Sequence, residues 1–218
     1  MAAISGKLAR IRYTAAVPTS STDQAADLAV DGVTLTINAT GRRRWDPTST
    51  KYAVYSDESS TSIAVPSSLY RIDHAVGRMV FSAAGSTSAT ITVDVPWLAT
   101  SYLTQAHAWT LNTDVDMLDC TAFSTGASGA AWRSYVPGLT DASVTISRFF
   151  STGDTGPVFI DRAVLNSPFY LELILNSTDQ AGYVCYGTVQ TDSLSEDVGG
   201  LVGEEITFKP TGQVYYTT

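Results

Sequence analysis

The stretch Ala142-Ser143-Val144-Thr145-Ile146-Ser147-Arg148-Phe149 is the most regular segment of the chain. Polar and apolar residues alternate along it with a period of two, which is typical of a half-buried β-strand. We expect Val144 and Ile146 to pack in a core, because alternate side chains of a strand point to opposite faces. The polar face of the same strand carries Ser143, Thr145 and Ser147.

Segments of similar character recur on both sides of this stretch. One helix is expected over 157–166, where Pro157 fits the first turn and Pro168 follows the end. The polar stretch 14–31 is expected to be a loop or extended arm, and Pro137-Gly138 to form a turn. Short strands at this spacing predict an all-β sandwich or barrel with one short α-helix. The expected strands are 7–13, 33–37, 52–55, 61–65, 69–72, 78–81, 89–95, 107–111, 132–136, 142–149, 169–176, 182–191 and 204–209.

The composition supports a β protein. Serine and threonine account for 53 of the 218 residues, and charged residues for 16%. Threonine, valine and tyrosine favour strands, because branched and aromatic side chains pack well on a pleated surface. The hydrophobic fraction of 44% also excludes a disordered chain.

The charge is unevenly distributed along the chain. Residues 1–80 carry a net charge of +2 and residues 81–218 a net charge of −10. An acidic protein does not bind phosphates by counterion release, so tight binding of nucleic acid is disfavoured. An acidic wall can nevertheless let DNA slide past without sticking. The run Arg42-Arg43-Arg44 is expected to be a solvated turn or a subunit contact.

Three regions follow from these patterns. Residues 1–29 are expected to form an N-terminal strand and arm, and residues 30–104 an inserted small antiparallel β unit. Residues 105–218 are expected to form the β-sandwich core with the single helix.

The sequence contains no recognisable catalytic, cofactor-binding or metal-binding motif. Asp114, Asp116 and Asp119 lack the glycine and glutamate that a calcium loop of the EF-hand type requires. His74 and His107 have no motif partner and are expected to be surface residues. We therefore expect no enzymatic activity and no cofactor.

Residues 107–146 resemble the signature of siphophage major tail tube proteins. That family typically has a tryptophan strand, an acidic-x-Thr-x-Phe segment, a Gly/Ser loop and an aromatic–Arg strand. These lead to Pro-Gly-Leu-x-Asp-Ala and a long amphipathic strand. The matching positions, the family-signature core, are Trp109, Thr121, Phe123, Trp132, Gly138, Leu139 and Asp141.

The resemblance implies a structural subunit that forms stacked, hexameric rings around a DNA-conducting lumen. Its implied partners are other copies of the chain, the tape measure, terminator and distal tail proteins, and DNA in transit, with no membrane. Ser143, Thr145 and Ser147 are the candidate lumen-facing residues. The implied location is the virion, after assembly in the host cytoplasm. Independently of the resemblance, two cysteines are too few for a disulfide scaffold, and Cys120 and Cys185 are expected to be reduced and buried.

Two other readings stay open. One is a terminator or baseplate ring protein of the same fold. The other is an adhesive, carbohydrate-binding β-sandwich, suggested by eleven tyrosines and by Trp45, Trp97, Trp109 and Trp132. Packing in a core or an interface explains these aromatic residues as well.

Overall fold

The structure is a computed structural model, and it describes residues 9–14, 18–49, 52–57, 62–83, 90–120, 135–150, 167–176, 181–196 and 202–217. This part of the chain is all-β, as predicted, and consists of two antiparallel sheets with two short 3-10 turns, η2 (Thr40–Arg42) and η3 (Ser67–Leu69). The helix expected over 157–166 lies outside the described residues.

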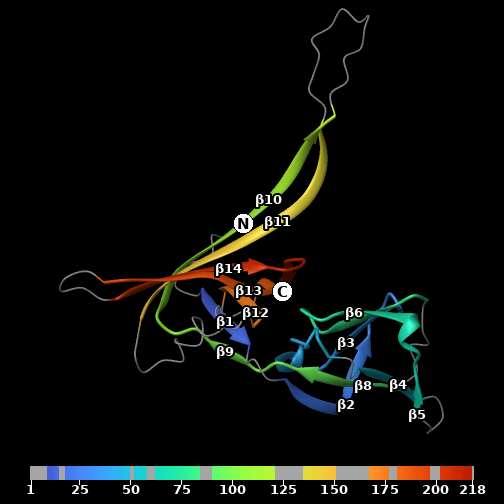
Figure 1. Cartoon of the computed structure of the whole chain (residues 1–218). Coiled ribbons are helices and arrows are strands. Elements are labelled where there is room, and N and C mark those ends of the chain that lie inside the picture. The colour runs from blue at the N-terminus through green and yellow to red at the C-terminus, as the bar shows by residue number, and fades with distance from the viewer. Residues whose placement is uncertain are drawn as a thin grey trace, which may run out of the picture.

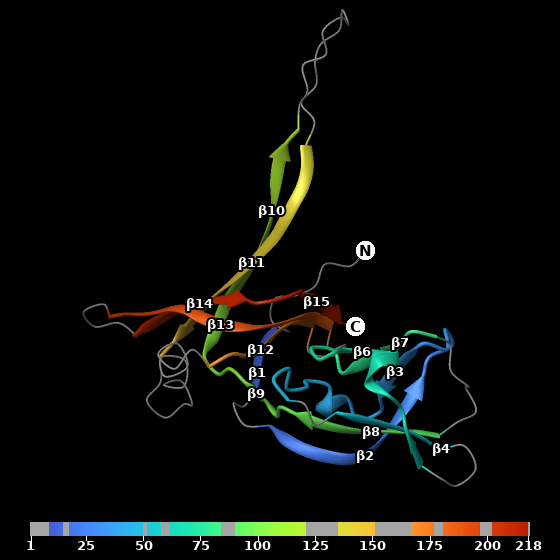
Figure 2. The same ribbon diagram turned by 45° about the vertical axis from the view of Figure 1, so that its right-hand side comes forward.

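Sheet A joins the first described strand to the C-terminal half of the chain (Figures 1 and 2). Its order is β10-β11-β14-β13-β12-β1-β9, and β15 also pairs with β13. All pairs are antiparallel. The strands are β1 (Arg10–Thr14), β9 (Thr100–Tyr102), β10 (Ala106–Asp119), β11 (Tyr135–Phe149), β12 (Phe169–Asn176), β13 (Ala181–Ser195), β14 (Gly203–Pro210) and β15 (Tyr215–Thr217).

Sheet B is formed by residues 19–97 alone. Its order is β5-β4-β8-β2-β3-β7-β6, again antiparallel throughout. The strands are β2 (Thr19–Leu28), β3 (Thr34–Ile37), β4 (Ala53–Asp57), β5 (Ser62–Ala64), β6 (Tyr70–Asp73), β7 (Arg78–Phe81) and β8 (Thr90–Trp97).

Each sheet has its own hydrophobic core. In sheet A the alternation of β11 buries Val144 and Ile146 completely, as expected from the sequence. They pack with residues of β1, β12, β13 and β14, including Phe169 and Phe208. In sheet B, buried residues of β3, β4, β7 and β8 surround Trp45, which is only 1% exposed.

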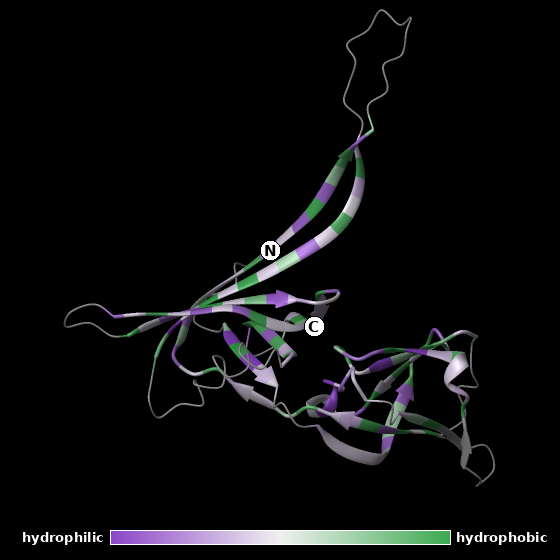
Figure 3. Ribbon diagram, viewed as in Figure 1, coloured by the Kyte–Doolittle hydropathy of each residue, from purple (hydrophilic) through white to green (hydrophobic). Residues whose placement is uncertain are grey.

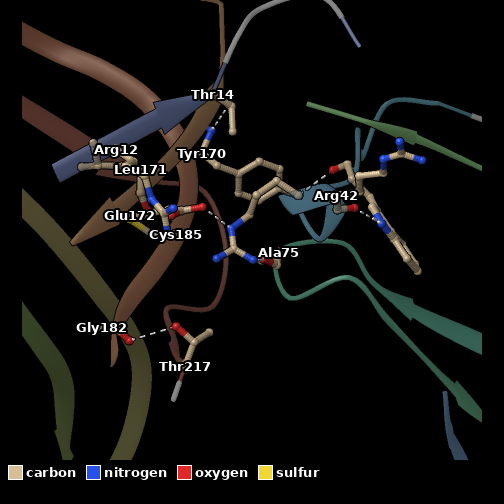
Figure 4. Close-up of polar contacts among 12 residues, drawn as sticks. Arg12, Thr14, Arg42, Ala75, Tyr170, Leu171, Glu172, Gly182, Cys185 and Thr217 are labelled. Atoms are coloured by element: carbon tan, nitrogen blue, oxygen red, sulfur yellow. Dashed lines mark hydrogen bonds and ion pairs between the residues drawn. The ribbon is translucent and has the colours of Figure 1, made fainter. Parts of the chain in front are cut away.

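A buried polar contact connects the two sheets (Figure 4). Glu172 of β12 is paired with Arg12 of β1 at 2.7 Å and with Arg44 at 2.6 Å. The hydroxyl of Tyr170, also on β12, donates to the backbone carbonyl of Trp45 at 2.8 Å. Two arginines around one carboxylate compensate its desolvation, so the sheets are joined by directional bonds as well as by apolar packing.

The arginine run is therefore not a solvated turn. Arg42 binds the side chains of Gln24 and Ser21 and lies over the ring of Trp97. Arg43 donates to the carbonyl of Ile37, and Arg44 donates to Ala75 as well as to Glu172. All three guanidinium groups have partners within the chain, which removes the basis for phosphate binding here.

Two local predictions were wrong. The stretch 14–31 contains β2, which lies between β8 and β3, because its backbone can pair on both sides despite its polar side chains. Pro137-Gly138 does not form a turn. β11 runs through it as one strand from Tyr135 to Phe149, and the irregularity is absorbed as a change of register against β10.

Candidate functional site

The outer halves of β10 and β11 form a two-stranded arm, residues 113–119 and 135–142. β11 pairs with β14 only from Val144 onward, so in the described part of the chain the arm strands pair only with each other. Figures 1 and 2 show the arm projecting away from both sheets.

One face of the arm continues the core face of sheet A. Trp109 and Leu111 of β10 pack against the sheet A core. Alternation places Val115 and Met117 on the same face, farther along the strand. Figure 3 shows apolar and polar residues alternating along the arm. These two side chains are 45% and 57% exposed. The apolar face of sheet A thus continues along the arm, past the residues that are buried in the core.

A β-bulge divides the arm. Val115 pairs with Thr140, whereas Met117 pairs with Pro137, so β11 holds one extra residue between these pairs. Leu139, at the bulge, is 80% exposed. The bulge increases the local twist and displays Leu139 to solvent.

Beyond the bulge the arm exposes further apolar side chains. Leu118 and Val136 are register partners and are 61% and 50% exposed, and Tyr135 is 44% exposed. The arm therefore presents apolar side chains on both faces. Clusters of this kind mark interaction sites, because a monomer gains nothing from leaving them in water.

The opposite face of β11, nearer the body, is polar. Ser143, Thr145 and Ser147 are half-buried and lie opposite Asn112, Thr110 and Ala108 of β10. On the other side, Thr145 and Ser147 pair with Thr207 and Glu205 of β14. The three candidate lumen residues thus belong to one continuous polar surface of sheet A.

Carboxylates mark the junction between this polar face and the arm. Asp114 and Asp141 are direct cross-strand partners. Lys209 of β14 forms an ion pair with Asp141. The hydrogen bond from Lys209, followed by one from the backbone of Ala142, lowers the pKa of Asp141. Lys209 thus offsets the repulsion between two like charges placed opposite each other.

The structure places only part of the family-signature core. Trp109 is half-buried against the sheet A core, Gly138 and Leu139 form the bulge, and Asp141 is exposed beside Lys209. Thr121, Phe123 and Trp132 lie outside the described residues. The exposed apolar residues of the arm were missed, because the strand at 107–111 was expected to end there. The continued alternation through Val115 and Met117 was the available signal.

The histidines and cysteines considered from the sequence do not form a common site among the described residues. The described residues contain no group of three or more His, Cys, Asp or Glu side chains able to hold a metal ion. His107 is exposed and stacks on Phe149, whereas His74 is half-buried with its ring edge-on to Tyr52, and this burial lowers the pKa of His74. Neither cysteine forms a disulfide, and Cys185 is buried as expected, whereas Cys120 is exposed.

No helix in the described ranges has the length and apolar character needed to cross a membrane.

No family model and no curated protein matches the chain. Several solved structures do. One is the SPP1 tail tube, with 14% identity, a TM-score of 0.36, and coverage of 76% of this chain and 74% of that chain. Another is the tail of an empty gene transfer agent particle with C6 symmetry, with 16% identity, a TM-score of 0.47, and coverage of 55% and 87%. A third is the virion of a native gene transfer agent particle, with 16% identity, a TM-score of 0.46, and coverage of 55% and 89%.

Proposed function

We propose that the chain is a structural subunit of a phage tail tube that assembles with copies of itself into stacked, hexameric rings. The observation that carries this proposal is the arm, where the core face of sheet A continues into solvent as Val115 and Met117. The resemblance of residues 107–146 to tail tube proteins supports the same assignment. The chain acts as a building element and not as an enzyme.

A second copy of the chain is the partner that fits the arm best. In the described part of the chain, β10 lies at an edge of sheet A, so its outer backbone groups are available for pairing. An arm that covers a neighbour's apolar surface forms a head-to-tail contact, and such contacts close into rings or extend into filaments. In this proposal, ring closure and ring stacking use the free edge of β10 and the exposed apolar faces of the arm.

The polar face of sheet A is the proposed lumen wall. Ser143, Thr145 and Ser147 offer hydroxyl groups without charge, and Glu205 and Asp114 add negative charge nearby, while the charge of Asp141 is balanced by Lys209. A wall of this kind repels the phosphate backbone and lets DNA pass during ejection.

Sheet B has a separate role in this proposal. We place the tube fold in sheet A, from β1 and β9 to β15, and treat sheet B, residues 19–97, as an inserted unit carried on it, so that β2 belongs to this unit and not to an N-terminal arm. Sheet B has its own core and meets sheet A through Glu172 and Tyr170. The inserted unit therefore decorates the tube without interrupting the pairing of sheet A.

Other tail proteins complete the proposed assembly. The tape measure protein fills the lumen before ejection, and the terminator and distal tail proteins cap the two ends. Assembly takes place in the host cytoplasm, and the final location is the virion.

Electron microscopy of negatively stained protein tests the proposal. The unaltered chain should form long tubes at high concentration. The double variant Val115→Asp/Met117→Asp should remain folded and form no tubes, because charged groups cannot be buried in an apolar contact. Leu69→Asp, at a 47% exposed position in η3 before sheet B strand β6, is the control and should still form tubes. Normal tubes from the double variant would exclude the arm as the assembly surface.

A ring that does not stack is the second candidate, as in a terminator or baseplate protein. The same micrographs distinguish it, since single rings without tubes would favour that function. The adhesive reading is weakened by the described tryptophans: Trp45 is buried, and Trp97 and Trp109 are half-buried in packing contacts.

The lumen assignment has its own test. Thr145→Lys or Ser147→Lys repeats around each ring and along each layer, which creates a basic stripe that holds DNA through counterion release. We expect tubes of normal appearance with slowed DNA release, relieved as salt rises. Normal release with both lysines present would show that this face is not the lumen wall.

A further inference from the structure

The core face of sheet A ends with two buried charged side chains, at the ends of β11 and β14 that lie away from the arm. After Val144 and Ile146, the next residue of β11 on this face is Arg148, and after Phe208 and Ile206 the next residue of β14 is Glu204. Arg148 and Glu204 are direct register partners, and their Nε and Oε2 atoms lie 2.5 Å apart. Both side chains are fully buried, with exposed fractions of 0%.

A β-bulge brings a third ionisable group to this place. On β13, Val189 pairs with Phe208 and Thr191 with Thr207, so β13 holds one extra residue, Gln190. The bulge shifts the alternation, and Asp192 pairs with Ile206 on the core face. Without the bulge, regular alternation from Val189 would turn Asp192 toward the polar face.

Three buried carboxylate oxygens of this cluster have no hydrogen-bond donor within the described residues. They are both carboxylate oxygens of Asp192 and Oε1 of Glu204. Asp192 and Glu204 lie on the core face of neighbouring strands at diagonal register positions, since Asp192 pairs with Ile206 and Leu194 with Glu204. Two ionised carboxylates can only accept, so a hydrogen bond between these two groups requires a proton.

We propose that Asp192 and Glu204 form a proton-binding site in which the two carboxyl groups share one proton beside Arg148. With that proton bound, the pair carries one negative charge, which the guanidinium group of Arg148 balances. Without it, one buried carboxylate has no compensating charge. The shared proton thus stabilises the contact between β13, beyond its bulge, and β14, beside Arg148 of β11.

The surrounding charges agree with this assignment. Among the described residues, the charged groups that face Asp192 are Glu204 of β14 and Arg148 of β11. Burial, and then the charge of Glu204, raise the pKa of Asp192 to about 6, while Arg148 opposes them. A carboxyl group with a raised pKa stabilises the fold when protonated. Its contribution is complete below the unfolded-state value of 3.8 and is lost as the pH rises through about 6.

A carboxyl titration by carbon-detected NMR on the unassembled chain reads the site directly. The Asp192 resonance should titrate near pH 6, with a coupled change at Glu204. Titration of Asp192 in the ordinary aspartate range, with no response from Glu204, would overturn the proposal.

Unfolding equilibria at several pH values provide the second test. Asp192→Asn replaces the shared proton by an amide N–H, which can donate to Glu204 at any pH. Between pH 3.8 and 7.5 the unfolding equilibrium constant of the unaltered chain should rise roughly a hundredfold relative to that of Asp192→Asn, as the shift from 3.8 to about 6 requires.

The matched control is Glu205→Gln, one residue along β14 on the exposed face. This variant should keep the pH dependence of the unaltered chain. Equal pH profiles for the unaltered chain and Asp192→Asn would refute the shared proton, as would loss of the pH dependence in Glu205→Gln.

Discussion

In sheet B, side chains of β3, β4, β7 and β8 meet in a core where Leu35, Val54 and Met79 are at most 1% exposed. In the arm of sheet A, side chains of the same kinds are 45–80% exposed. Sheet B curls over its own apolar residues and is complete within one chain. The arm carries as strong an apolar pattern with nothing from its own described residues to cover it. The comparison shows that a strand pattern predicts which side chains need a partner, but not whether the partner is in the same chain.

The largest expected effect lies in the sheet B core. Trp45→Ala should destabilise the chain by about 3–5 kcal/mol, because Trp45 is 1% exposed and the substitution leaves a large cavity. Denaturant unfolding of the unassembled chain measures it. Leu69→Ala, at a 47% exposed position, serves as control and should change the stability by less than about 0.5 kcal/mol. A small effect at Trp45 would mean that sheet B is not closed in the way described.

A smaller loss is expected where the two sheets meet. Arg44→Ala removes one of the two cations around Glu172 and leaves Arg12 in place. We expect a loss of about 2–3 kcal/mol, typical of hydrogen bonds to charged groups. Arg71→Ala, on a side chain that is 73% exposed, is the control and should cost less than about 0.5 kcal/mol. Equal effects of the two variants would show that the contact between the sheets adds nothing.

A weaker effect is expected for His74 and depends on pH. Burial lowers its pKa below the usual 6.5, so the folded chain favours the neutral ring. The stabilisation is therefore present above pH 6.5 and is lost as the pH falls through the lowered pKa. His74→Gln should remove this part of the acid sensitivity in thermal unfolding. A variant with unchanged acid sensitivity would show that His74 is not linked to folding.

The smallest effect is expected in the arm. Met117→Ser should change the stability of the unassembled chain by less than about 0.5 kcal/mol, since the side chain is already 57% exposed. The same variant should raise the protein concentration at which tubes form, measured by light scattering. A large loss of monomer stability would mean that the arm is packed within its own chain.

Local alternation predicted much of the fold. β12 spans the residues expected, and Val144 and Ile146 are buried as the pattern required. β2 was missed because polar side chains such as Ser21 and Gln24 give no apolar signal, and its place depends on pairing with β8 and β3. The partners of Arg44 were also beyond sequence reasoning, because Glu172 lies 128 positions away along the chain. Bulges were equally hidden, since one extra residue is visible only against the opposite strand.

The pairing of β1 has a consequence for the order in which the chain folds. Arg10 of β1 lies opposite Ile174 of β12, roughly 160 residues later, whereas all of sheet B comes from residues 19–97. On a ribosome, sheet B can therefore form while β12 is still unsynthesised, because nearby segments meet at a lower entropic cost than distant ones. The edge of β1 that pairs with β12 therefore stays open until most of the chain has been synthesised. β9 can pair earlier, but only with the other edge of β1, so the β12 side remains exposed to pairing with a neighbouring nascent chain.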